Sequence, residues 1–362
     1  MKLGLNGRFL AARLTGVQRV AHGLCGALFE RTDAALFVPA NARVGELPGH
    51  VRVLRGVLRG HAWEQLELPR MARAAQIDLL INPANSGPWT GSPHALFVHD
   101  VLPLTHPQWF SRSYALFQRH ALRWALARAS HVFTSTHCTA EQILRISGAP
   151  PRVHVVTQGL QPFHAPASAA DVTRVRAQLD LEGPFFLFVG LGDGRKNMEL
   201  LVRALREVQA TRRFTLVAVG KRARRIHSRS AELGALPWLR VVEHATDAEL
   251  RALYSGALAL CFPSWAEGFG RPPLEALACG APAVVGDYAA AHELLGDAVP
   301  ILPFQAAPWI EQLRRLLDDP MERTRLVQRG TAQLERFDWG LAAEQMLSAL
   351  KVNVNSPWRV TA

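Results

Sequence analysis

Short apolar runs alternate with amphipathic stretches along the whole chain. In the first half, the apolar runs predict strands at residues 2–6, 35–39, 51–55, 77–82, 94–99, 131–136 and 153–157. The stretches between them carry a helical period and predict helices at residues 16–30, 63–75, 112–129 and 138–147. This alternation is typical of βα units that build a parallel sheet.

The same pattern restarts after residues 159–170, which hold two prolines, lack periodicity and are interpreted as a linker. Strands are expected at residues 185–190, 214–220, 239–243, 257–262, 282–286 and 298–302. Helices are expected at residues 171–180, 197–210, 222–233, 247–256, 272–279, 289–295, 306–318 and within 320–350. The chain is therefore expected to form two doubly wound α/β domains with a ligand cleft between the carboxyl ends of their sheets.

Composition narrows the class of protein. A length of 362 residues favours two domains over one. No apolar run reaches the ~18 residues of a spanning helix, and the first residues suit a strand better than a signal peptide. We expect a cytoplasmic protein, soluble or peripheral at the inner membrane surface. The four cysteines show neither CxxC pairing nor metal-ligand spacing, which favours buried free thiols.

The net charge of +11 is unevenly distributed. Residues 1–165 contain 17 Lys and Arg against 8 Asp and Glu, so the first half carries most of the excess. Several of its arginines recur along the predicted helix at 112–129, beside apolar residues. Such a helix could rest on an anionic membrane surface or simply present a solvated basic face. No nucleic-acid-binding pattern is present.

The most informative segment runs from Pro263 to Ala276 and reads PSWAEGFGRPPLEA. It follows a predicted strand and enters a predicted helix. Gly268 and Gly270 allow close backbone approach to a ligand, and the two prolines that follow suit a first helical turn. A loop that enters a helix N-terminus in this way is a natural seat for a phosphate group.

Glu267 and Glu275 flank this phosphate seat. One carboxylate could face a sugar, while the other could accept both hydroxyls of a ribose. Glu275 taken alone could be an ordinary first-turn acid favoured by the helix dipole. The complete string, with its strand before and helix after, favours the functional interpretation.

This string resembles the donor-binding motif of retaining glycosyltransferases of family 4. The resemblance extends over nearly the whole chain, through Thr15 to Arg19, Val98 to Asp100, Gly190 to Asn197 and Val219 to Lys221. It implies a GT-B fold, in which two Rossmann-like domains face a central cleft, a nucleotide-sugar donor, retention at the anomeric carbon and no metal or other cofactor. It further implies an acceptor-binding domain at 1–160, a nucleotide-sugar-binding domain at 161–335 and a helix at 336–352 that crosses back to the first domain.

The resemblance also assigns residues. It implies catalytic roles for His99, Glu267 and Lys196 and an acceptor-side role for Asp100. The implied donor-binding residues are Gly16, Arg195, Lys196, Lys221, Glu267, Gly268, Phe269, Gly270, Leu274 and Glu275.

Two lysines can supply the positive charge that a metal would otherwise bring to a diphosphate. Lys196 and Lys221 each follow the end of a predicted strand, in a chain whose other basic residues are almost all arginine. A compact ammonium can lie between two phosphates as a point charge. The alternative is a solvated surface lysine. Relatives often carry an arginine at the position of Leu191, so the two lysines would bear more of the charge here.

The first-domain residues have alternatives of their own. His99 could be a core histidine bonded to the backbone rather than an active-site group. Asp100 could fix the tautomer of His99 or contact the acceptor. Gly16 could let backbone N–H groups approach a phosphate, or could simply begin a helix capped by Thr15.

The expected reaction is transfer of a hexosyl residue, mannose from GDP-mannose as first choice, to a hydroxyl of a glycan or lipid-diphosphate-linked acceptor in polysaccharide biosynthesis. The motifs look most like those of bacterial mannosyl- and rhamnosyltransferases. A dTDP- or UDP-sugar donor, a nucleotide-sugar epimerase or sugar phosphorylase, and a non-catalytic nucleotide-sugar-binding subunit are the alternatives.

Overall fold

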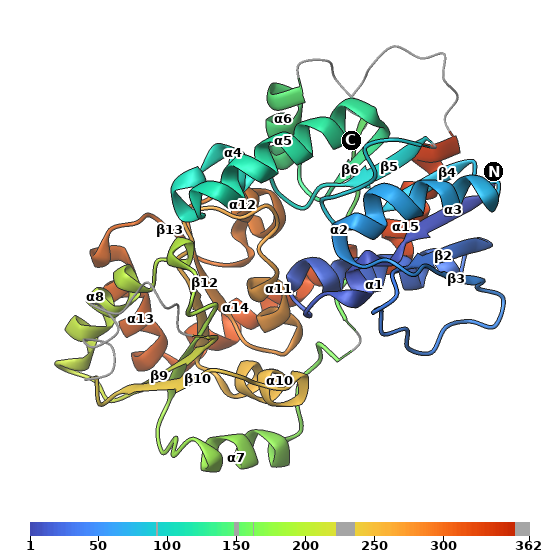
Figure 1. Cartoon of the computed structure of the whole chain (residues 1–362). Coiled ribbons are helices and arrows are strands. Elements are labelled where there is room, and N and C mark those ends of the chain that lie inside the picture. The colour runs from blue at the N-terminus through green and yellow to red at the C-terminus, as the bar shows by residue number, and fades with distance from the viewer. Residues whose placement is uncertain (92, 148–151, 162, 222–235, 352–362) are drawn as a thin grey trace. The chain divides into compact units, whose positions relative to one another are not determined.

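The computed structural model describes residues 1–91, 93–147, 152–161, 163–221 and 236–351. The chain divides into two compact units (Figure 1). The first comprises residues 1–160 together with the segment from Arg336 onwards, and the second comprises Gln161–Glu335. Each unit is built on one parallel sheet with helices packed against it, which confirms the predicted α/β class.

The first unit contains a seven-stranded sheet in the order β3-β2-β1-β4-β5-β6-β7, and every pair of neighbours is parallel. The central strand β1 pairs Leu3 with Ala34 on one side and with Leu79 on the other. Because both faces of such a sheet are covered, its central strands are apolar at nearly every position. The strands are β1 (Leu3–Asn6), β2 (Ala34–Val38), β3 (Val53–Arg55), β4 (Leu79–Asn82), β5 (His94–Phe97), β6 (Ala129–Thr134) and β7 (Arg152–Val155).

Alternate strand residues of the first unit point to different helices. Leu36 lies in the core shared with α1 and α15, whereas its neighbour Phe37 packs with Trp63 and Leu68. Strand β5 packs against the helix pair α5 and α6 through Leu96. The α-helices are α1 (Gly16–Phe29), α2 (Gly60–Ala62), α3 (Leu68–Ala74), α4 (Leu102–Thr105), α5 (Arg112–Arg128), α6 (His137–Ser147) and α15 (Trp339–Lys351), and 3₁₀ turns lie at η1 (Gly7–Ala11) and η3 (Pro107–Trp109).

The helix predicted at 63–75 is wrong in its details. The helical run starts earlier, with α2, and continues as a π-helix, η2 (Trp63–Glu67), before α3. Pro69 has no N–H to donate to the carbonyl of Gln65, so the regular α-helical bond cannot form at that point. The Glu67 carboxylate also accepts bonds of 2.9–3.0 Å from the backbone N–H groups of Val57 and Leu58, which ties this turn to the preceding loop.

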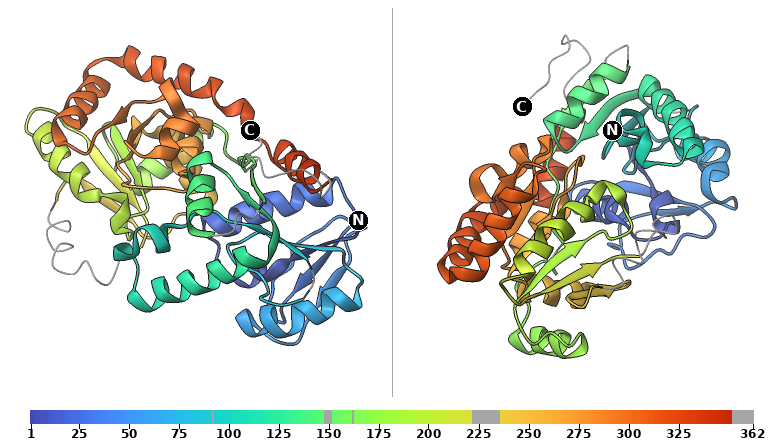
Figure 2. Two further views of the ribbon diagram at one scale, coloured as in Figure 1. Left: turned by 90° about the horizontal axis from the view of Figure 1, so that it is seen from above. Right: turned by 90° about the vertical axis from the view of Figure 1, so that its left-hand side faces the viewer.

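The second unit, seen from two further sides in Figure 2, contains a six-stranded parallel sheet in the order β10-β9-β8-β11-β12-β13. The predicted strand at 298–302 is reduced to the two residues of β13, because a 3₁₀ turn, η6 (Gly296–Ala298), takes up the residues before it. The other strands are β8 (Phe185–Val189), β9 (Thr215–Val219), β10 (Leu239–Val242), β11 (Ala259–Phe262) and β12 (Ala283–Gly286), and β13 is Ile301–Leu302.

The helices of the second unit follow the prediction closely. Those at 247–256, 289–295 and 306–318 are observed with the predicted bounds, and the predicted helix at 222–233 lies outside the described residues. The segment predicted as helical at 320–350 consists of two helices separated by a 3₁₀ turn, η7 (Leu334–Arg336). The helices are α7 (Ala169–Gln178), α8 (Met198–Gln209), α10 (Asp247–Gly256), α11 (Arg271–Ala278), α12 (Ala289–Leu295), α13 (Ala306–Asp318) and α14 (Pro320–Ala332), and a further 3₁₀ turn is η4 (Gly194–Lys196).

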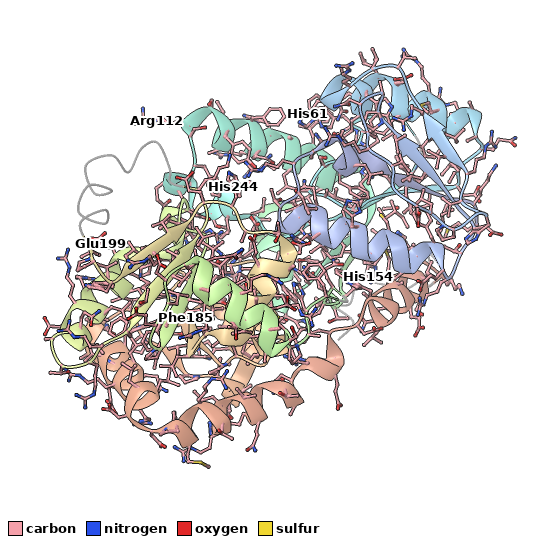
Figure 3. All side chains as sticks on the ribbon, turned by 90° about the horizontal axis from the view of Figure 1, so that it is seen from below. His61, Arg112, His154, Phe185, Glu199 and His244 are labelled. Carbon is pink, nitrogen blue, oxygen red and sulfur yellow. The ribbon has the colours of Figure 1, made fainter. Side chains whose placement is uncertain are left out.

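Both faces of this second sheet are covered. Phe186 and Phe188 lie in the core that α8 and α13 share. Phe185, labelled in Figure 3, points the other way, where the Arg176 guanidinium of α7 lies 5.7 Å from its ring centroid. The carboxyl edge of the sheet is thereby left for loops, and these loops carry the site residues.

Helix α15 packs against α1 within the first unit (Figure 1). Its first residue, Trp339, occupies space that two glycines leave open. A Cβ atom added at either Gly23 or Gly159 would overlap the Trp339 indole. The absence of side chains at these two positions therefore determines how closely α15 approaches.

This packing predicts opposite effects for two alanine substitutions on α1. Gly23→Ala should lower the free energy of unfolding by about 1–3 kcal/mol, since overpacking costs that much. Gly26→Ala is the matched control, because a Cβ there would meet nothing within 4 Å, and it should be neutral or stabilising by up to about 1 kcal/mol. Urea unfolding measures both, and equal destabilisation by the two substitutions would contradict the proposed packing.

Candidate active site

Three of the predicted donor residues, Arg195, Lys196 and Glu267, meet at the switch point of the second sheet. Strands β8 and β11 are neighbours, but the chain continues from β8 towards β9 and β10 and from β11 towards β12 and β13. Arg195 and Lys196 follow β8, whereas Glu267 follows β11. Ligands of open α/β sheets bind outside the carboxyl ends of the strands at such a switch point.

The Glu267 carboxylate is the centre of this arrangement. Its Oε1 accepts bonds from Lys196 Nζ at 2.5 Å and from Ser264 Oγ at 2.6 Å, and its Oε2 pairs with Arg195 Nη1. Only 9% of the side chain is exposed. Burial alone would raise the pKa of Glu267, but the charges of Lys196 and Arg195 hold that pKa below its usual value. Glu267 is therefore ionised at neutral pH.

Lys196 is held by its surroundings as well as by its charge partner. Its Nζ lies 4.2 Å from the ring centroid of Phe262, a cation–π contact. Gly190 has a φ of +106°, and a Cβ there would lie 3.2 Å from the aliphatic stem of Lys196. Burial lowers the pKa of Lys196, and the Glu267 carboxylate opposes this effect.

Arg195 ties the two loops together. Its Nη1 donates to the carbonyl of Ala266 and its Nη2 to Asp193 Oδ2, both at 2.7 Å. In return, the backbone N–H of Trp265 donates to the Arg195 carbonyl at 3.0 Å. Burial lowers the pKa of Arg195, but the carboxylates of Glu267 and Asp193 outweigh this effect and raise the pKa above its usual value. The guanidinium is thus a fixed structural cation beside Lys196.

The loop after Glu267 enters helix α11 at Arg271. Gly270, at the N-cap, has a φ of +84°, and a Cβ there would lie 2.6 Å from Tyr288 Oη. Only glycine fits this position without strain. The positive end of the α11 dipole is therefore brought next to the Glu267 cluster, by which we mean Glu267, Lys196, Arg195, Asp193 and Ser264.

Glu275 occupies a nearly buried site on α11, with 8% of the residue exposed. Its Oε2 accepts from Tyr254 Oη at 3.1 Å, and its Oε1 accepts from Arg271 Nε at 3.2 Å. His164 Nε2 lies 3.8 Å from the same Oε1. Burial and the Glu275 carboxylate raise the pKa of Tyr254. The phenol therefore stays protonated and can donate its hydrogen bond to Glu275. A ribose at Glu275 would share the carboxylate with these groups.

Three other predicted donor residues differ in exposure. Lys221 is exposed at the end of β9, next to Gly220, whose φ is +135°. Phe269 is 7% exposed and Leu274 is completely buried. The Leu274 side chain belongs to the core of the unit. Any contact of Leu274 with the nucleotide sugar would therefore come from its main chain.

In the first unit, Gly16 begins α1, and a Cβ at this position would meet nothing within 4 Å. The open space agrees with the predicted approach of a ligand to the backbone. The alternative, a helix that simply begins here with Thr15 as its cap, is confirmed for the position of Thr15 but not for its side chain. Thr15 is the N-cap residue, but its hydroxyl donates to Gln18 Oε1 and accepts no bond from a backbone N–H of the helix.

His99 lies two residues beyond β5 and is 7% exposed. Its Nε2 lies 2.9 Å from the Pro83 carbonyl, which can only accept, so this nitrogen carries a proton. In the neutral ring Nδ1 is then the acceptor. Asp100 Oδ1 accepts a 3.0 Å bond from the backbone N–H of Leu102, and its role beside His99 stays a prediction.

Several residues that shape the site have no role predicted from the sequence. Ser264 and Asp193 bond directly to members of the Glu267 cluster, and Tyr254 bonds to Glu275. Ser264 and Asp193 lie within the quoted motifs, so their spacing could have identified them. Tyr254 has no local signal, because only the fold brings α10 next to α11.

Two protein families and several curated proteins resemble this sequence. The family model described as Glycosyltransferase Family 4 matches residues 14–162, and the model described as Glycosyl transferases group 1 matches residues 171–333. O-antigen chain mannosyltransferase B of Escherichia coli is 27% identical over 266 residues, which are 70% of this chain and 69% of that protein. Other curated relatives are matched over 54–62% of their own length.

Two solved structures share the fold. Sucrose-phosphate synthase of Thermosynechococcus elongatus has a TM-score of 0.75 at 21% identity, over 97% of this chain and 98% of its own. Anabaena Alr3699/HepE, solved in complex with UDP-glucose, has a TM-score of 0.74 at 18% identity, over 97% and 99% of the two chains. The two family models together match most of the sequence, and the chain belongs to the family 4 glycosyltransferases, with a GT-B fold and a resemblance to bacterial mannosyltransferases.

Proposed function

We propose that this chain transfers a hexosyl residue from a nucleotide sugar to a hydroxyl of a glycan or lipid-linked acceptor, with retention of the anomeric configuration. The observation that carries the proposal is the Glu267 cluster, in which two buried cations and one carboxylate meet at the switch point of the second unit. A site of this kind suits a ligand that joins an anionic diphosphate to a hydroxyl-rich sugar.

The leaving group is a nucleoside diphosphate, and its developing charge needs stabilisation. Lys196 and the N-terminus of α11 supply positive potential at one edge of the sheet, in a buried setting where electrostatic interactions are strong. Arg195 is already engaged with Glu267 and Asp193, so its main effect is to hold the carboxylate in place. In this proposal a metal ion is not required, because the protein provides the counter-charge.

Glu267 would orient the sugar and stabilise positive charge near the anomeric carbon. Retention would arise from attack on the face that the diphosphate leaves, with the departing phosphate helping to deprotonate the acceptor. His99 would contribute from the first unit, where the Pro83 carbonyl holds its ring through Nε2. A product analysis by ¹H NMR, which resolves the anomeric configuration, tests retention directly.

GDP-mannose is our first choice of donor, and the 27% identity to an O-antigen chain mannosyltransferase supports it. A UDP-sugar is the second choice, since a protein of the same fold was solved with UDP-glucose. These choices are distinguished by measuring the melting temperature of the protein in the presence of GDP, UDP, dTDP or ADP. The nucleotide that belongs to the donor should give the largest increase in melting temperature.

The acceptor is proposed to be linked to a lipid diphosphate. Helix α5 exposes apolar side chains, with Leu116 58% exposed, next to Arg119 and Arg123. These residues line a groove of about 360 Å³ that also includes Leu104 and Ile146. Among the described residues, no helix has the length and apolar character needed to cross a membrane. Contact through such a surface would therefore be peripheral.

The ribose assignment predicts a specific effect of Glu275→Gln. This substitution keeps the shape and a bond to Tyr254 but removes the charge, so the dissociation constant of the preferred nucleotide should rise about tenfold. Hydrogen bonds to charged groups are worth about 1.5–3 kcal/mol. Glu275→Ala should weaken binding further and also lower the melting temperature, because it leaves the Tyr254 hydroxyl buried without this acceptor. Unchanged nucleotide affinity in the Gln variant would disprove the assignment.

The membrane assignment predicts salt-sensitive binding to vesicles. The chain should co-sediment with vesicles that contain anionic lipid at low salt, and binding should fall as salt rises, because each basic group contributes about 1 kcal/mol. Replacing Arg119 and Arg123 together by Gln should reduce binding, whereas replacing Arg203 and Arg206 on α8 of the second unit should not. Equal binding to neutral and anionic vesicles would contradict this part of the proposal.

A further inference from the structure

A second cluster of polar side chains lies at the switch point of the first sheet. Strands β1 and β4 are neighbours there, and the chain continues from them in opposite directions. Arg8 follows β1 and Ser86 follows β4, so residues from both sides meet above the same edge. They line an open pocket with a cavity volume of about 70 Å³, together with His61, Gln65, Trp89 and Phe117. We call it the Glu64 pocket.

Glu64 lies beneath the pocket and is fully buried. Its Oε1 accepts from Asn6 Nδ2 at 2.9 Å, Arg8 Nε at 3.0 Å and Ser86 Oγ at 2.9 Å. Its Oε2 lies 3.3 Å from His61 Nδ1. Burial would raise the pKa of Glu64, but His61, Arg8 and the hydrogen bonds hold that pKa below its usual value. An ionised carboxylate therefore holds the pocket's polar groups in place.

The groups that face the pocket are fixed by further bonds. Arg8 Nη2 donates to Ser86 Oγ at 2.6 Å, so the guanidinium plane cannot swing away. Gln65 accepts from the Trp89 backbone N–H at 2.8 Å and donates to the Gly87 carbonyl at 3.1 Å. Glu64 and Gln65 both belong to the π-helix η2, and π-helical turns often mark functional sites.

Two aromatic rings complete the pocket. Trp89 is 38% exposed and Phe117 is 42% exposed. The Phe117 ring centroid lies 5.6 Å from that of His61, which Figure 3 labels beside α5. Exposed rings next to planar hydrogen-bonding groups suit a ligand with apolar C–H faces and hydroxyl edges. Because Glu64 balances the charge of Arg8, an uncharged ligand is favoured over a phosphate.

We propose that the Glu64 pocket binds an uncharged glycosyl unit of the acceptor. Trp89 and Phe117 would contact the sugar faces, Arg8 and Gln65 would bond to its hydroxyls, and Glu64 would act as a positioning residue. Asn85 also lines the pocket, and its Oδ1 accepts from the His99 backbone N–H at 2.6 Å. The pocket thus adjoins the segment of His99 and Asp100. This inference rests on the proposed function, because it takes the first unit as the acceptor side.

Saturation-transfer NMR on the full chain tests the proposal with methyl α-D-mannopyranoside and methyl α-D-glucopyranoside as probes. At least one glycoside should receive saturation from the wild type. Trp89→Ala should weaken its binding at least fivefold. Trp124→Ala, which removes another exposed tryptophan, outside the pocket, should leave the binding unchanged. Glu64→Gln should weaken binding without removing any ring, and a melting curve shows whether that variant is folded.

The possible outcomes separate the two proposals. Absence of glycoside binding in the wild type, equal binding by Trp89→Ala, or displacement of the glycoside by inorganic phosphate would each overturn the inference. Nucleotide binding is measured on the same variants by melting temperature and should be unchanged in Trp89→Ala. If no nucleotide binds the wild type but glycosides bind at Trp89, the proposed function fails while the sugar site stands.

Discussion

The buried ion pair between Lys196 and Glu267 is the interaction on which the second unit's site depends. It joins the loop after β8 to the loop after β11, and the two loops come from opposite sides of the switch point. Removing one partner of a buried pair leaves an uncompensated charge, which costs about 3–5 kcal/mol. The surrounding backbone is built for this contact, with left-handed conformations at Gly190 and Asn197. The pair therefore fixes the loops before any ligand arrives.

The two units use the same architectural position for different chemistry. In each sheet, the neighbouring strands at the switch point send polar side chains to the carboxyl edge. The second unit places a carboxylate between two cations there, which suits a ligand with a diphosphate and a sugar. The first unit places a buried carboxylate under an arginine and two exposed rings, which suits an uncharged sugar. In both proposals the sheet topology determines the position of the site, and the composition of the loops determines the kind of ligand that it suits.

Much of the fold could be predicted from the sequence, because apolar runs and amphipathic stretches directly reflect the parallel strands and their helices. Three helices of the second unit were predicted with their observed bounds. The motif around Glu267 also led to its partners Arg195 and Lys196, since each follows a recognisable strand. The π-helix at Trp63–Glu67 could not be predicted, because helical periodicity does not distinguish it from a regular helix. Glu64 was missed for a related reason: its partners Arg8 and Ser86 lie far away in sequence.

The central claim is that Lys196 supplies the counter-charge for the donor diphosphate. Titration calorimetry in the presence of EDTA tests it most directly, with the nucleoside diphosphate that gives the largest melting shift and the corresponding monophosphate. The wild type should bind the diphosphate at least tenfold more tightly than the monophosphate, and Lys196→Gln should lose most of this preference while it remains folded. Equal affinity of the wild type for the two nucleotides, or a preference that survives in the variant, would contradict the claim.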